Sequence, residues 1–223
     1  MEEKRLTEVY NLIYDVEQIK RFAKLINCEK SIHNMYLACR SKYGATKQHH
    51  RGVQFLNNVD IDQFVDAVRF YEIPYGSYKY NNQIIPSSVL VIYCSTNSRS
   101  EHKAHTEMMQ LGLNHAFSRQ KFNIYSHAIS LLSSKHEKIE LLTIDVDDKS
   151  QYEEVAQFLN SEKIVPLAVV ETRGGYHILI KAGGNLKKLF MQFGHKHTIS
   201  DTACPIPGTI QGGFPVRFVD TKH

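Results

Sequence analysis

The order of segments after residue 139 constrains the fold more than any other feature of this chain. Strand-like and helix-like stretches alternate there as β-α-β-β-α-β, which places the first and third strands side by side at the centre of one sheet. The predicted segments are a strand over 139–146, a helix opened by a Ser150-x-x-Glu153 capping box, strands over 164–172 and 176–181, a helix over 186–193 and short extended stretches. The turn Arg173-Gly174-Gly175 predicts a hairpin between the second and third strands. We therefore expect an α+β fold.

The first half of the chain has a weaker pattern. Apolar residues at three- and four-residue steps predict helices over 7–27 and 31–40, and the polar, cationic stretch 41–52 predicts an exposed loop. Two interpretations suit this loop equally well, a phosphate-binding loop and a solvated basic loop. The acid-x-acid spacing of Asp60 and Asp62 precedes a helical period, which favours Asp60 as a helix N-cap over a metal ligand.

A strand, a polar turn and a helix follow one another in the middle of the chain. The strand covers 89–93, and the turn contains Arg99. Such a turn commonly presents backbone N–H groups and an arginine to an anion, but the same order of elements occurs in any α/β unit. The tyrosine-rich turn over 74–82 could stack on bases, but such turns more often pack against their own domain. We expect a helical N-terminal region (1–84) and a core (85–223) that divides into an α/β part (85–138) and the sheet part (139–223).

The composition fits a folded protein with a negatively charged partner without requiring one. Lysine and arginine number 27 against 23 acidic residues, which gives a formal charge of +4, and 42% of the residues are hydrophobic. The four cysteines lie far apart without a CxxC spacing, so they indicate neither a zinc knuckle nor a disulfide framework. No apolar run approaches the roughly 20 residues that span a bilayer. These features predict a soluble, intracellular protein.

Two acidic residues, Asp145 and Asp147, stand at the end of the first strand of the predicted sheet. Because side chains alternate along a strand, both carboxylates lie on one face, whereas Asp148 lies on the other. Two like charges this close are unfavourable unless a cation lies between them. Paired carboxylates with open positions suit Mg²⁺ or Mn²⁺ bound together with substrate phosphates, so the spacing predicts phosphoryl-transfer chemistry.

The predicted hairpin brings His177 towards this acid pair. His177 shares a face with Leu179, and an imidazole there could bond a phosphate oxygen, while Gly174 and Gly175 allow the backbone to approach a ligand. Alternatively, the glycines form a plain hairpin turn and His177 is a surface residue. The segment alone leaves both hypotheses open.

Taken together, these residues resemble the archaeo-eukaryotic primase superfamily, the primase-polymerase fold of replicative primases and end-joining polymerases. Its acid-x-acid motif matches Asp145-Val146-Asp147, and its small-x-His motif matches Gly175-Tyr176-His177. Its third signature, an acid shortly before a Pro-Gly segment, has its closest match in Asp201 and the stretch 205–213, although the basic residues that commonly flank Pro-Gly are missing. Asp220 is a rival for this third acid. The resemblance covers about residues 85 to 220.

The resemblance implies an RRM-like sheet packed with an α/β module, and a two-metal nucleotidyltransferase activity that joins nucleotides on a primer or template. The implied ligands of Mg²⁺ or Mn²⁺ are Asp145, Asp147 and Asp201, with Asp220 as the alternative third acid. His177 would contact the triphosphate of the incoming nucleotide. The other nucleotide-binding candidates are Arg173, Gly175, Gln211 and Arg99. The implied partners are nucleoside triphosphates, single-stranded or primed nucleic acid, and replication or repair proteins.

Two other classes of function compete with this expectation. The altered third signature and the cationic loop from Lys42 to Arg51 favour a catalytically degenerate nucleic-acid-binding factor of the same fold. A metal-dependent nuclease is the third candidate, because acidic clusters also hold metals for hydrolysis. His195-x-His197 together with Cys204 lacks a convincing fourth ligand, so a zinc module of the kind found in many primases is not expected.

Overall fold

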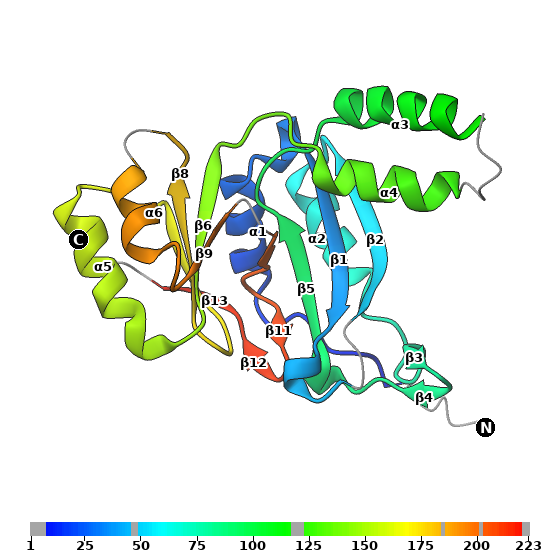
Figure 1. Cartoon of the computed structure of the whole chain (residues 1–223). Helices are drawn as coiled ribbons and strands as arrows, with labels where there is room; N and C mark the ends of the chain where they lie inside the picture. The colour runs from blue at the N-terminus through cyan, green and yellow to red at the C-terminus, as the bar shows by residue number, and fades with distance from the viewer. Residues whose placement is uncertain (1–7, 46–48, 117–122, 184–185, 201–202, 220–223) are drawn as a thin grey trace.

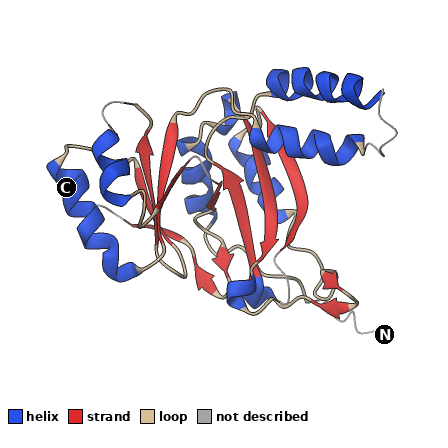
Figure 2. Ribbon diagram, viewed as in Figure 1, coloured by secondary structure: helices blue, strands red, loops and turns tan. Residues whose placement is uncertain are grey.

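Two antiparallel β-sheets lie side by side in the computed structural model, which describes residues 8–45, 49–116, 123–183, 186–200 and 203–219 (Figure 1). The described residues also form six α-helices, so the fold is α+β, as the sequence predicts (Figure 2). The helices are α1 (Val16–Leu25), α2 (Ile61–Arg69), α3 (Glu101–Ala116), α4 (Ile124–Ser134), α5 (Tyr152–Ser161) and α6 (Lys187–Phe193). Short 3₁₀ helices η1 (Cys28–Lys30), η2 (Ser41–Tyr43), η3 (Ser87–Val89) and η4 (Lys149–Gln151) connect some of these elements.

The second sheet is the one that the last third of the sequence predicts. Its elements follow the chain in the order β6-α5-β7-β8-α6-β9, and its strand order is β13-β7-β8-β6-β9, with β6 and β8 adjacent as expected. The strands are β6 (Leu141–Val146), β7 (Ala168–Glu171), β8 (Tyr176–Lys181), β9 (Thr198–Ser200) and β13 (Arg217–Val219). Apolar side chains of α5 and α6 cover one face, and the other face is turned towards the first sheet.

The first sheet has the order β10-β5-β1-β2 and combines strands from distant parts of the chain. Its strands are β1 (Ile32–Cys39), β2 (His49–Asn57), β5 (Leu90–Ser95) and β10 (Ala203–Pro205). Two small hairpins complete the strand inventory of the described residues, β3 (Lys79–Tyr80) with β4 (Gln83–Ile84), and β11 (Ile210–Gln211) with β12 (Phe214–Pro215). The sheet therefore spans the division at residue 84 that the sequence suggests.

The helix predicted over 31–40 is wrong, because this segment is the strand β1. β1 pairs with β2 along one edge and with β5 along the other, and the side chains on both of its faces are largely buried. A strand of this kind carries a near-continuous apolar run, whose period does not distinguish it from a buried helix. The exposed loop predicted over 41–52 is also wrong at both ends, where η2 and the start of β2 lie.

Helix starts were predicted with mixed success. Asp60 is the N-cap of α2, as expected, and it also forms a full capping box with Gln63. By contrast, the capping box predicted at Ser150 is wrong, because the Asp148 carboxylate accepts the Ser150 N–H at 2.9 Å and opens η4 instead. Likewise, α1 begins only after Asp15, whose carboxylate caps it, and Val9 and Ile13 before it form isolated β-bridges instead of helix.

Replacing Asp60 with alanine is expected to lower the free energy of unfolding by about 1 kcal/mol, because the first turn of α2 loses a side-chain acceptor. Urea unfolding followed by circular dichroism measures this change. Asp62→Ala is the matched control, since Asp62 is an exposed acid of the same turn that forms a surface ion pair with Lys20. Equal losses in the two variants would contradict the assigned cap.

The main hydrophobic core lies between the two sheets and under α1 and α2. It joins residues from Tyr10 to Val216, so segments from both ends of the chain contribute to one core. His33 is buried within this part of the structure, where its Nδ1 lies 2.9 Å from the Ser95 carbonyl oxygen and its Nε2 lies 3.1 Å from the Ile26 carbonyl oxygen. Burial lowers the pKa of His33 to about 4.

This pKa predicts a loss of stability in mild acid. The unfolded chain protonates His33 below a pH of about 6.5, whereas the folded chain does so only near 4, so the unfolded state binds more protons between these values. The free energy of unfolding is therefore expected to fall by up to about 3 kcal/mol from this residue as the pH drops from 7 to 4. Urea unfolding at pH 7, 5.5 and 4.5 should show a weaker pH dependence for His33→Gln, and an unchanged dependence would contradict the prediction.

Candidate functional site

A pocket of about 240 Å³ between the two sheets contains both acids of the predicted motif. One wall comes mainly from the second sheet and includes Asp145, Asp147, His177 and Thr198. The opposite wall comes from β1, β5 and the segment after β1, and it includes Tyr36, Arg40, Lys42 and Tyr93. An acidic wall therefore faces a basic and aromatic wall.

The acid pair is arranged as strand alternation predicts. Asp145 lies on β6, Asp147 follows the last residue of that strand, and both line the pocket. Asp148 turns away and caps η4. The side chain of Asp147 is 77% exposed and that of Asp145 is 32% exposed, so a cation could reach both carboxylates from the open side.

His177 lies directly opposite Asp145 in the register of β8 with β6. Its Nε2 is 3.3 Å from Asp145 Oδ1, which confirms the predicted proximity and excludes the plain surface residue. Burial lowers the pKa of His177, although the Asp145 carboxylate acts in the opposite direction. His177 Nδ1 is buried and has no hydrogen-bond partner among the described residues.

The tight approach of the hairpin to β6 requires Gly175. A Cβ atom added at Gly175 would lie 1.7 Å from the Val146 carbonyl oxygen, so no larger residue fits without a shift of the backbone. The turn is closed by Thr172, whose Oγ1 accepts the Gly175 N–H at 3.2 Å. Close packing of this turn on the end of β6 holds His177 opposite Asp145.

Arg173 and Gln211 connect the hairpin to the segment after β10. The Arg173 N–H donates to Gln211 Oε1 at 2.9 Å, and its guanidinium donates to the Gly212 carbonyl oxygen at 2.7 Å. The guanidinium also lies 4.5 Å from the centroid of the Tyr43 ring. Both residues were predicted to bind the nucleotide. Gln211 lines the pocket, whereas Arg173 is bound to protein groups beside it.

The basic residues of the pocket were largely missed by sequence reasoning. Lys42 Nζ lies 3.5 Å from Asp147 Oδ1, and Arg40 lines the same pocket with its Nε buried and without a hydrogen-bond partner among the described residues. Lys42 belonged to the stretch for which phosphate binding was one of two interpretations. Arg40 had no such signal, because it was placed at the end of a predicted helix.

Arg99 and the two candidates for a third acid are not part of the described pocket. Arg99 is buried, its Nε donates to Asn34 Oδ1 at 3.1 Å, and its guanidinium contacts the His136 ring, so it does not line this pocket. Asp201 and Asp220 lie outside the described residues. Their part in the site therefore stays a prediction.

The donor set suits a hard divalent cation. Two carboxylates on one wall, open towards the cavity, are the oxygen ligands that Mg²⁺ and Mn²⁺ bind together with water and phosphate. Within the described part of the chain, no group of three or more His, Cys, Asp and Glu side chains could hold a metal ion. The remaining ligands would therefore be water, a phosphate or a third acid.

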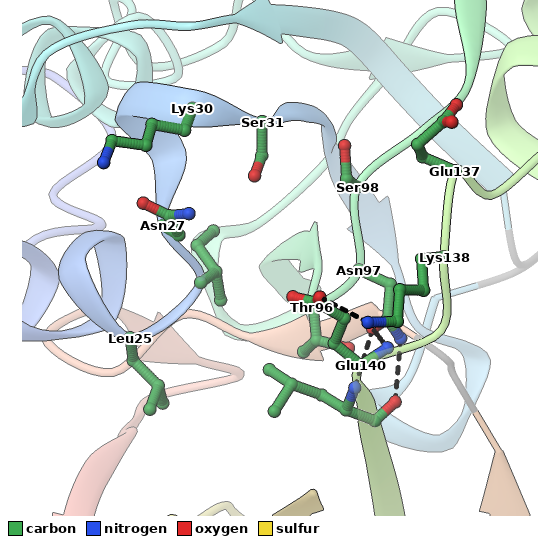
Figure 3. A pocket seen from close by; sticks show the side chains of 12 residues that line it. Leu25, Asn27, Lys30, Ser31, Thr96, Asn97, Ser98, Glu137, Lys138 and Glu140 are labelled. Atoms are coloured by element: carbon green, nitrogen blue, oxygen red, sulfur yellow. Dashed lines mark hydrogen bonds and ion pairs between the residues drawn. The ribbon is translucent and has the colours of Figure 1, made fainter. Parts of the chain in front are cut away.

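A second pocket, of about 350 Å³, lies at the other end of β6 (Figure 3). Asn97 is central to its structure: its Oδ1 accepts the N–H groups of Glu140 and Leu141 at 2.8 Å, and its Nδ2 donates to the Leu141 carbonyl oxygen at 2.8 Å. Asn97 thus ties the loop after β5 to the start of β6. This contact helps to fix the relative position of the two sheets that form the acidic pocket.

Comparison of the chain with family models, curated proteins and solved structures gave no match. Among the described helices, none combines the length and apolar character needed to cross a membrane.

Proposed function

We propose that this chain is a metal-dependent nucleotidyltransferase of the primase-polymerase type, which adds nucleotides to a nucleic-acid strand. The observation that carries the proposal is the pocket in which Asp145, Asp147 and His177 face Arg40 and Lys42. The acids suit divalent cations, and the facing cations suit the phosphates of a nucleoside triphosphate. Phosphoryl transfer needs both kinds of group within one site.

The arrangement of the second sheet supports the same proposal. The strands of the β-α-β-β-α-β unit lie in the order β9-β6-β8-β7, which is consistent with an RRM-like sheet. The acid-x-acid motif lies at the end of its first strand and the small-x-His motif at the start of its third. This placement agrees with the resemblance to the primase-polymerase fold.

Each side chain of the pocket would have a separate role in the reaction. Asp145 and Asp147 would hold Mg²⁺ or Mn²⁺, which when bound lowers the pKa of the attacking 3′-hydroxyl and neutralises charge on the transferred phosphoryl group. Lys42 would exchange the Asp147 carboxylate for a phosphate oxygen, and Arg40 would bind a second one. Burial lowers the pKa of His177, and a neutral ring has one N–H, which would be directed to Asp145 before substrate binds and to a phosphate oxygen once a cation occupies Asp145.

Asp201 is the better candidate for the third acid. Its described neighbour Ala203 lines the pocket, whereas Asp220 follows β13, which is separated from β6 by β7 and β8. We expect Asp201→Asn to lower nucleotide incorporation at least about 100-fold, as loss of a charged metal ligand should, and Asp220→Asn to change it less than about twofold. Primer-extension rates measure both effects. The reverse order of effects would assign the third acid to Asp220.

The proposed activity is tested by incorporation of labelled nucleotides on primed and unprimed single strands with Mn²⁺ or Mg²⁺. We expect extension that stops when the metal is removed by a chelator. Salt-dependent binding of the strands with no nucleotide incorporated would instead indicate a nucleic-acid-binding factor. Shortening of the labelled strand would indicate a nuclease. Either of these results would overturn the proposal.

A further inference from the structure

The first sheet carries an aromatic patch on the face that is turned away from α1 and α2. Along β1, Met35 and Leu37 belong to the main core, so Tyr36 between them projects to the opposite face. On this face Tyr36 packs in a small separate cluster with Ala38, Val91, Tyr93 and Ala203. We call the rings of Tyr36 and Tyr93 the tyrosine pair.

The tyrosine pair is a stacked, pre-formed platform at the edge of the acidic pocket. The two ring centroids are 5.5 Å apart with an interplanar angle of 21°, and both rings line the pocket. Tyr93 is 8% exposed, whereas Tyr36 is half-buried and is therefore the more accessible ring. The guanidinium of Arg40 lies 5.8 Å from the centroid of the Tyr93 ring, which brings a cation to the same surface.

Helices cover this face only in part. α4 reaches the start of β1, where Asn34 Nδ2 lies 3.5 Å from Ser133 Oγ. In the described part of the chain no α-helix crosses the lower half of this face, and the 3₁₀ helix η2 lies at its lower end (Figure 1). The tyrosine-rich turn considered from the sequence offers no comparable platform. The rings of Tyr75 and Tyr78 pack against Tyr10, with centroids 5.0 and 4.9 Å away.

The size of the pocket indicates what lies beside it. Its volume of about 240 Å³ is below the range of roughly 300–1,000 Å³ that is usual for sites enclosing whole small ligands. A strand whose end reaches the carboxylates must therefore extend over the neighbouring surface. The tyrosine pair is part of that surface, and Arg40 and Lys42 border it with positive charge.

We infer that a single-stranded polynucleotide lies over this face of the first sheet and that one of its bases stacks on Tyr36. Aromatic rings on an open sheet face with flanking cations bind single strands without sequence preference, because every base has a face that can stack. The inference rests on the proposed function in one respect, because that function requires the end of the strand to point towards Asp145 and Asp147. It does not require that the protein incorporates nucleotides.

Photocrosslinking tests the inference on the wild-type chain without nucleoside triphosphates, so that binding is measured apart from incorporation. An oligothymidylate containing 5-iodouracil is irradiated with the protein, and the linked peptide is located by mass spectrometry. We expect the crosslink at Tyr36. A crosslink at another site, or one at Tyr36 that forms with 5-iodouridine triphosphate but not with the strand, would overturn the inference.

Binding of a fluorescent oligonucleotide at fixed salt gives a second measure. Tyr36→Ala is expected to raise Kd about 10-fold, whereas Tyr36→Phe keeps the ring and should change Kd less than twofold. Phe70→Ala is the matched control, because Phe70 is 61% exposed and does not line the pocket. If Tyr36→Ala does not fold, the crosslink and the binding of Tyr36→Leu, which also lacks the ring, test the inference instead. Unchanged binding by folded Tyr36 variants would overturn the inference, even if the protein incorporates nucleotides. If the variants bind as expected but the wild-type protein incorporates no nucleotide, only the proposed function is overturned.

Discussion

Asp145→Asn combined with Asp147→Asn is expected to lower metal-dependent nucleotide incorporation by at least about 10³-fold. The asparagines keep the size and much of the hydrogen bonding of the carboxylates but remove the charges that hold a divalent cation. A bound metal contributes several kcal/mol of transition-state stabilisation, and each 1.36 kcal/mol corresponds to about a factor of ten in rate. Single-turnover primer extension with Mn²⁺ measures the effect.

Asp148→Asn is the matched control for this double variant. Asp148 neighbours the pair in sequence but turns away from the pocket to cap η4, and asparagine caps helices as well as aspartate does. Activity and thermal stability should therefore stay close to wild type. Full activity of the double variant would remove the acid pair from the mechanism.

Gly175→Ala is expected to damage the fold and the site together. Its Cβ would lie 1.7 Å from the Val146 carbonyl oxygen, so the hairpin must move away from the end of β6. We expect a loss of roughly 3 kcal/mol in the free energy of unfolding, at the upper end of what overpacking costs. Displacement of His177 by about 1 Å should lower incorporation about 100-fold in the fraction that remains folded.

Gly174→Ala is the matched control, because it adds the same methyl group one residue earlier. The nearest atoms to a Cβ at Gly174 are Lys42 Nζ at 3.7 Å and the Asp147 carbonyl oxygen at 3.9 Å, which are ordinary contacts. Stability should change by less than about 0.5 kcal/mol, as for most surface substitutions. Urea unfolding of both variants compares them directly, and equal losses would show that the close approach at Gly175 is not what matters.

The second sheet could be predicted from sequence because its signals are local. Glycines mark the turn before β8, and the polar and apolar residues of the strands alternate enough to assign faces. The hairpin pairs His177 with Val170, and the pairing of β8 with β6 places it opposite Asp145. The proximity of His177 to Asp145 follows from strand alternation together with the order of elements, which makes the first and third strands neighbours. The strand order of the sheet could then be predicted by placing the first and third strands, β6 and β8, side by side.

The first sheet could not be predicted in the same way, because long-range pairing forms it. β1 is buried between β2 and β5 and has no local signal that separates it from a helix. As a result, Tyr36 and Arg40 could not be placed opposite the acids. Arg99 was predicted to bind a nucleotide, but it is buried and donates to Asn34. A strand-turn-helix pattern does not tell whether the turn faces a ligand or the protein interior.

The electrostatics of the pocket explain how the acid pair is tolerated before a metal binds. Lys42 contacts Asp147, and the neutral ring of His177 contacts Asp145, so each carboxylate has its own partner. Both side chains of the Lys42–Asp147 pair are exposed, so the pair is weak. Lys42 can therefore turn to a phosphate when a metal cation takes its place beside Asp147.

A crystal of the protein soaked with Mn²⁺ and a non-hydrolysable nucleoside triphosphate tests the central claim most directly. We expect an anomalous Mn²⁺ peak about 2.1 Å from carboxylate oxygens of both Asp145 and Asp147, with the triphosphate reaching Lys42 and His177. Mn²⁺ and triphosphate bound elsewhere, with the pocket between the two sheets left empty, would contradict it.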